Sequence, residues 1–170
     1  MPNIDIRFVA EDTIFSRVIN WFTQAKFSHV GAMMINGQPY EVGARLFADG
    51  AKAGGVQSRP ANYAKFTRQQ TLSFSVNGFQ FDTFWAFIRA QMGKPYDKTA
   101  ILGFLTERDW HDPKAWFCSE LITAALEKAG IIRPVPADVW KITPEMCYLI
   151  CSQAGATPIP PTFSIGSLSA

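Results

Sequence analysis

Apolar side chains occupy every second position at the start of the chain, at Ile4, Ile6 and Phe8. This period of two predicts a half-buried strand over residues 3–9. The strands expected from such alternation and from short apolar runs are residues 3–9, 27–35, 40–42 and 71–76. Asn36-Gly37 between two of them is typical of a hairpin turn. We interpret residues 43–60, which are rich in glycine, alanine and polar residues, as a long loop with a short strand around Val56.

Apolar residues at helical spacing follow in four places, and the helices expected from them are residues 12–24, 79–92, 118–129 and a segment that begins after Thr143-Pro144. The helix over 118–129 has the clearest pattern, because its apolar residues share one face and Gly130 provides a C-terminal stop. The proline-containing tail, 154–170, is expected to pack loosely or in extended form. Together these elements indicate one α+β domain over residues 1–170.

Composition limits the classes of function. The formal net charge of the 170 residues is only +2 and the basic residues are scattered, which argues against a nucleic-acid-binding surface. No basic start followed by an apolar run marks a signal peptide, and no apolar run approaches the roughly 20 residues of a membrane span. We therefore expect a protein without a transmembrane segment, located in the cytoplasm, with a phage or prophage origin as one source.

Three cysteines do not suggest a disulfide framework, and two histidines supply few zinc ligands. No metal or cofactor is expected. Cys147 and Cys151 lie four residues apart on one face of the last expected helix. Buried packing is the favoured interpretation for them, and a role in redox chemistry or metal binding is the alternative.

Cys118 is the first residue of the clearest helix. Unpaired N–H groups and the positive end of the helix dipole at this place favour a thiolate, and they can also stabilise the oxyanion that forms when a carbonyl is attacked. We therefore expect the pKa of Cys118 to lie below the ~8.5 of a free cysteine. A structural cysteine between aromatic residues is the alternative. The candidate bases are His29, within a strand, and His111, in a turn-forming segment.

The motifs Ser28-His29-Val30-Gly31, Tyr40-Glu41-Val42 and Phe117-Cys118-Ser119-Glu120-Leu121-Ile122, in this order, resemble the NlpC-type thiol hydrolases. The resemblance is to the circularly permuted papain-fold branch, which includes the YiiX/YebB-like proteins and the relatives of lecithin:retinol acyltransferase. It covers roughly residues 25–150. Shorter likenesses at 54–56, 93–97 and 142–144 belong to it as well.

This resemblance implies a permuted papain-like fold, in which an antiparallel sheet packs against the helix that carries the cysteine. It implies Cys118 as nucleophile, His29 as general base and Glu41 as the residue that orients the imidazole. Tyr96 matches a family tyrosine that contacts the oxyanion or the substrate. For Glu41 the alternative is a strand residue facing solvent, and for Tyr96 it is packing.

Hairpin geometry tests the place of Glu41. A two-residue turn would put Glu41 and His29 on opposite faces of the sheet, whereas a three-residue turn would pair Glu41 with Gly31 and put them on one face. If Glu41 orients His29, we expect the second register, with a bulge and a left-handed Gly37.

The expected function is a cysteine-dependent hydrolase of amide or ester bonds, such as a peptidase or amidase acting on cell-wall peptides, that forms a thioester intermediate. The alternatives are an acyltransferase or thioesterase acting on lipids, and a non-catalytic binding module, associated with a phage or an effector, that kept the fold. The partner would be a peptide, amide or acyl-ester substrate, and no nucleic acid.

Overall fold

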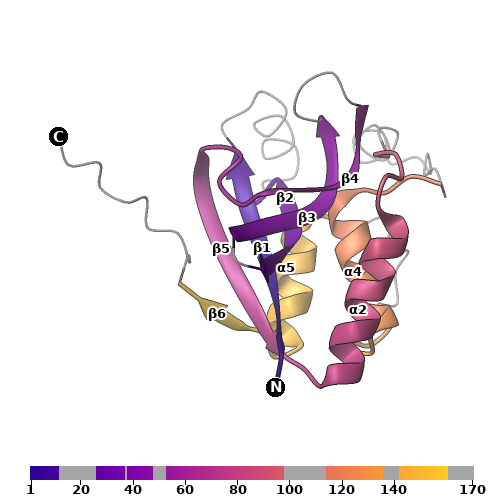
Figure 1. The fold of residues 1–170 in the computed structure, drawn as a ribbon. Coiled ribbons are helices and arrows are strands. Elements are labelled where there is room, and N and C mark those ends of the chain that lie inside the picture. The colour runs from indigo at the N-terminus through magenta and orange to yellow at the C-terminus, as the bar shows by residue number, and fades with distance from the viewer. Residues whose placement is uncertain (12–25, 37, 48–52, 98–113, 136–141, 161–170) are drawn as a thin grey trace.

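The computed structural model describes residues 1–11, 26–36, 38–47, 53–97, 114–135 and 142–160 (Figure 1). The elements are β1 (Asn3–Glu11), β2 (His29–Asn36), β3 (Gln38–Phe47), β4 (Ala53–Pro60), β5 (Phe66–Ser75), α2 (Gly78–Gln91), α4 (Cys118–Lys128), α5 (Pro144–Gln153) and β6 (Thr157–Ile159). The α+β class expected from the sequence is confirmed. The helix expected at 12–24 lies outside the described residues.

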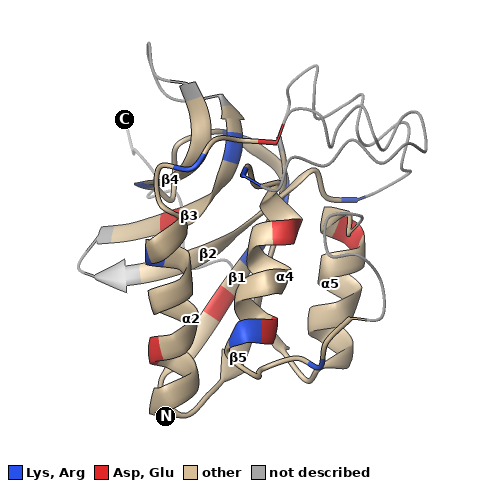
Figure 2. Ribbon diagram, turned by 90° about the vertical axis from the view of Figure 1, so that its right-hand side faces the viewer, with Lys and Arg blue, Asp and Glu red and all other residues tan. Residues whose placement is uncertain are grey.

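One six-stranded sheet, in the order β4-β3-β2-β1-β5-β6, is antiparallel at every described pair of strands. The three described helices cover one face of this sheet, and Figure 2 shows them in front of it, with acidic and basic residues scattered over them. Within the described ranges, no helix is both long and apolar enough to cross a membrane.

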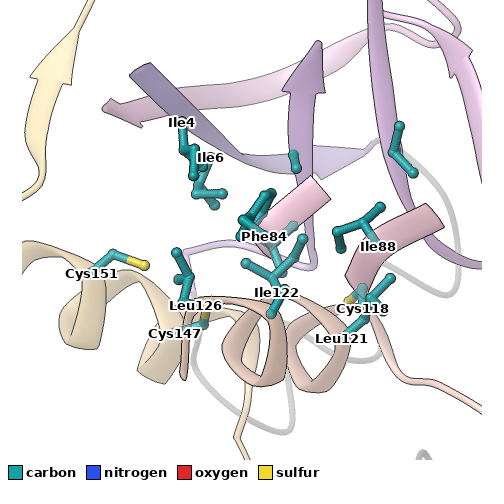
Figure 3. Packing of buried hydrophobic residues seen from close by; sticks show 14 of the residues in the cluster. Ile4, Ile6, Phe84, Ile88, Cys118, Leu121, Ile122, Leu126, Cys147 and Cys151 are labelled. Atoms are coloured by element: carbon teal, nitrogen blue, oxygen red, sulfur yellow. The ribbon is translucent and has the colours of Figure 1, made fainter. Parts of the chain in front are cut away.

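The core lies between the sheet and the helices (Figure 3). Ile6 on β1, Ala32 on β2 and Val42 on β3 are cross-strand neighbours, so their side chains point to the same face, and all three are buried in the core. Phe84 of α2 and Ile122 of α4 pack in this layer. The residues between these positions therefore project to the opposite face of the sheet, and this second face carries the polar candidates.

The strand expected around Val56 is confirmed as part of β4, but the long loop expected over the rest of residues 43–60 is wrong, because β3 continues to Phe47 and β4 spans Ala53–Pro60. β3 and β4 pair from Tyr40↔Pro60 to Phe47↔Ala53, and glycine makes the close approach of the chains possible. A Cβ on Gly54 would come within 2.4 Å of the carbonyl oxygen of Arg45. Glycine lets the two strands pack closely here, although a glycine-rich composition by itself suggests a loop.

Residues 157–159, in the tail expected to pack loosely or in extended form, are extended and form β6, which pairs with β5. The expected helix after Thr143-Pro144 is confirmed: α5 begins at Pro144, and the Thr143 side chain accepts a hydrogen bond from the N–H of Met146. Gly130 follows α4 with a positive φ of 64°, as its role as a C-terminal stop requires.

Candidate active site

His29 and Glu41 meet on the second face of the sheet. His29 begins β2, and its Nε2 lies 3.0 Å from Oε1 of Glu41 on β3. Both side chains are buried. Their contact therefore gives the imidazole a fixed orientation, with Nε2 towards the carboxylate.

The hairpin reaches this arrangement in a register that differs from the expected one. Glu41 pairs with Met33 and not with Gly31, because Asn36 pairs directly with Gln38. The turn is thus shorter than the expected three-residue turn, and the register is shifted by two residues. A shift of two preserves the face of every side chain, so Glu41 and His29 still share one. The conformation expected for Gly37 falls outside the described residues.

Gly31 lets the carboxylate of Glu41 cross β2. A Cβ at Gly31 would lie only 2.6 Å from Cγ of Glu41. Gly31 is paired with Arg7 of β1, and the carboxylate reaches that arginine: Nε of Arg7 donates to Oε2 at 2.6 Å. The three central strands are thereby joined by one polar cluster.

Arg45, four residues after Glu41 on β3, completes this cluster. Its Nη2 donates to Oε1 of Glu41 at 2.8 Å, so Arg45 and His29 share one carboxylate oxygen. The Arg45 guanidinium also stacks on the ring of Tyr63, with Cζ 3.6 Å from the ring centroid. Burial would raise the pKa of Glu41, but the hydrogen bond from His29 and the charges of His29, Arg45 and Arg7 hold that pKa far below its usual range.

Cys118 is the first residue of α4 and is 1% exposed. The backbone N–H groups of Val30 and Ser119 donate hydrogen bonds to its thiol. Val30 lies beyond Ala32↔Val42, the last described pair between β2 and β3. The thiol therefore contacts the backbone of β2 at Val30, the residue that follows His29. Backbone N–H groups lie in the plane of the sheet and point to neither of its faces.

The expectation of a lowered thiol pKa is wrong for this arrangement. Burial raises the pKa of Cys118 to about 12, although the N–H groups of Val30 and Ser119 and the charge of Arg45 oppose it. Loss of water around the anion outweighs the helix terminus, because the thiol lies within the core cluster. At neutral pH Cys118 is a neutral thiol.

Tyr96 lies beside the residue that precedes the nucleophile candidate. It bridges to Trp116, and its ring centroid is 5.7 Å from that of Phe117. Burial raises the pKa of the Tyr96 phenol well above its usual value, and the nearby Cys118 and Asp97 act in the same direction. The hydroxyl is therefore protonated and can donate a hydrogen bond.

Sequence reasoning missed Arg7, Arg45 and Tyr63. Alternation along β1 would place Arg7 on a solvent-facing side, yet it is 1% exposed. The segment that joins β4 to β5 covers it, since Nη1 of Arg7 donates to the carbonyl of Ala61 at 2.7 Å. The sequence signal for Arg7 was an arginine among alternating apolar residues. This pattern does not tell whether the side chain faces solvent or a buried partner.

The remaining candidates lie apart from this cluster. Cys147 and Cys151 are buried in α5, where Thr123 donates to the Cys147 sulfur at 3.6 Å. His111 is outside the described residues. Among the residues that the structure does describe, no three His, Cys, Asp or Glu side chains gather as metal ligands would. Glu41 itself faces two guanidinium groups, a setting that repels a cation.

No protein-family model matches the sequence, and no curated protein matches it. Among solved structures, the fold is similar to that of the metalloprotein YiiX from Escherichia coli O157:H7, with a TM-score of 0.55 and 23% sequence identity. The match covers 74% of this chain and 64% of that chain, so this chain spans less than two thirds of YiiX. The comparison thus shows a fold similar to that of YiiX.

Proposed function

We propose that this protein is a cysteine-dependent hydrolase of amide or ester bonds, with Cys118 as nucleophile, His29 as base and Glu41 as the residue that orients His29. Cell-wall peptides are one class of substrate for the proposed peptidase or amidase. The observation that carries the proposal is the contact of 3.0 Å between His29 Nε2 and Glu41 Oε1, one residue along β2 from the N–H that holds the Cys118 thiol.

The ring orientation assigns a role to each nitrogen of His29. Nε2 faces Glu41, so Nδ1 is the nitrogen that takes the proton of Cys118. Sγ attacks the carbonyl carbon, and the proton on His29 then passes to the departing amine or alcohol as the bond to it breaks. A water that loses its proton to His29 hydrolyses the thioester, which releases the carboxylic acid and restores the thiol.

The buried thiol changes how this reaction begins. Because Cys118 is neutral at rest, His29 must remove its proton during the attack on the substrate. A thiolate–imidazolium pair is not formed before the substrate binds. The N–H groups at the start of α4 and the protonated hydroxyl of Tyr96 are the donors suited to the oxyanion.

The description of YiiX as a metalloprotein belongs to YiiX. In this chain, the carboxylate of Glu41, which a metal ion would need as a ligand, already binds the guanidinium groups of Arg7 and Arg45. No step of the proposal therefore uses a metal.

A non-catalytic binding module is the second candidate, and the 1% exposure of Cys118 favours it. A lipid-directed acyltransferase or thioesterase would use the same three residues. The decisive experiment is to incubate the protein with p-nitrophenyl acyl esters of several chain lengths and with peptide p-nitroanilides. Intact-mass spectrometry then detects the acyl adduct.

We expect an adduct on Cys118 that disappears in Cys118→Ala and His29→Ala and persists in the matched controls Cys147→Ala and His111→Ala. Peptide or acyl preference then separates the substrate classes. Absence of an adduct with every probe, or an adduct that survives in Cys118→Ala, overturns the hydrolase proposal.

A further inference from the structure

The polar cluster around Glu41 carries more positive than negative charge. One carboxylate, that of Glu41, accepts hydrogen bonds from the guanidinium groups of Arg7 and Arg45. All three side chains are at least nine-tenths buried. Charges removed from water interact strongly with neighbouring groups, so this excess acts on whatever ionises beside it.

Arg45 is the member of this cluster that binds the same carboxylate oxygen as His29. Val30, the residue after His29, donates its N–H to the Cys118 thiol. The place of Arg45 over the ring of Tyr63 fixes the guanidinium. We propose that Arg45 is a positioning residue of the proposed hydrolase: its charge stabilises the anion that Cys118 becomes on losing its proton, and it holds the carboxylate oxygen that orients His29.

The charge balance of proton transfer supports this role. Protonation of His29 alone would add a positive charge beside two guanidinium groups. Transfer of the proton from Cys118 to His29 creates an anion and a cation together, so the total charge of the site is unchanged. Arg45 then favours the anionic partner. The charge of Arg45 lowers the pKa values of both Cys118 and Tyr96, against the effect of burial.

Other ionisable groups also face these residues. Cys147 of α5 raises the pKa of Cys118, and Asp97 raises that of Tyr96. Arg59 of β4 is a matched comparison, since its guanidinium lies over the same Tyr63 ring, with Cζ 5.6 Å from the centroid. The inference rests on the proposed function, because Arg45 is assigned a role in that hydrolase. Thiol ionisation can nevertheless be measured without any substrate.

The test is the rate at which iodoacetamide modifies Cys118 and Cys147 in one sample, resolved by peptide mass spectrometry between pH 7 and pH 10. Cys147 is fully buried in the same core, so its rate reports how often the core opens. The ratio of the two rates therefore isolates the ionisation of Cys118 from general loosening of the fold. The variants are Arg45→Met, Arg45→Lys and the control Arg59→Met.

We expect Arg45→Met to lower the ratio about tenfold at a given pH, which corresponds to about one unit of thiol pKa. Arg45→Lys should keep the ratio within about threefold of that of the unmodified protein, because it keeps the charge. Arg59→Met should leave the ratio unchanged. If Arg45→Met does not fold, Arg45→Gln removes the charge while keeping a donor for Glu41.

An unchanged ratio in the uncharged Arg45 variants, or an equal fall in Arg59→Met, overturns the inference. Failure of the proposed function looks different, because it would leave this ratio dependent on Arg45 while no acyl adduct forms on Cys118.

Discussion

The missing side chain of Gly31 is what allows Glu41 to reach across β2. A Cβ there would stand 2.6 Å from Cγ, 2.8 Å from Cδ and 2.9 Å from Oε1 of Glu41, all closer than real contacts allow. The carboxylate fills this space and extends from β3 to Arg7 on β1. A glycine in the middle of β2, which weakens a strand in isolation, is therefore required by the buried charge of its neighbour.

Gly31→Ala should accordingly destabilise the protein by about 1–3 kcal/mol, the usual cost of overpacking. The added methyl group displaces Glu41 from both His29 and Arg7. Urea denaturation followed by circular dichroism measures the free energy of unfolding. Gly43→Ala is the matched control, because a Cβ at Gly43 would meet no atom closer than 3.3 Å. Equal stability of the two variants would contradict the crossing of β2 as the reason for glycine.

Glu41→Gln should remove part of the acid sensitivity of the fold. The folded pKa of Glu41 lies far below the 4.5 of the unfolded chain. Its charge therefore stabilises the fold fully above pH 4.5, and this contribution is lost as the pH falls towards the folded pKa. We expect unfolding free energies measured between pH 7 and pH 3 to fall less steeply in Glu41→Gln, and to be about 3–5 kcal/mol lower at pH 7 because two buried guanidinium groups lose their counter-ion. An acid slope identical to that of the unmodified protein would rule out this role.

The same variant tests the orientation of His29. Glu41→Gln keeps an acceptor for the imidazole but loses the charge that stabilises imidazolium, so turnover should fall by about ten- to a thousandfold, less than the loss in His29→Ala. Steady-state kinetics at a temperature where both variants are folded provides the measurement. Unchanged turnover in Glu41→Gln would remove Glu41 from the mechanism.

Cys118 should react slowly with alkylating reagents at neutral pH. A thiol whose pKa is about 12 carries far less thiolate at pH 7.5 than a free cysteine, so we expect iodoacetamide to modify it at least about a hundredfold more slowly than glutathione. The rate should rise tenfold per pH unit between pH 7 and pH 9. Rapid modification at pH 7, with a plateau below pH 8, would show that the thiol is ionised in the folded protein.

Tyr96→Phe should separate packing from chemistry. The substitution keeps the ring beside Phe117 and removes the protonated hydroxyl. We expect turnover to fall by about tenfold or more, as for loss of one oxyanion donor, while the melting temperature changes little. A fall in melting temperature without a change in turnover would assign Tyr96 to packing.

Much of the local structure follows from the sequence because its causes are local. Alternation at Ile4, Ile6 and Phe8 predicts β1, and Thr143-Pro144 predicts the start of α5, since each depends on side-chain period or capping within a few residues. That His29 and Glu41 share one face follows from strand parity once Glu41 is taken to orient His29, because a two-residue turn would put them on opposite faces. The exact register does not, because two registers that differ by two residues present the same faces.

The ionisation of the thiol was decided by the tertiary structure alone. The sequence places Cys118 at a helix start, which favours the anion, and the surrounding core then excludes water and reverses the sign. Arg7 illustrates the same limit: the pattern of β1 leaves its environment open, and a segment more than 50 residues away covers it. Local pattern fixes where a side chain can point, whereas burial and charge partners depend on chain segments distant in sequence, and these set the energy of each ionised group.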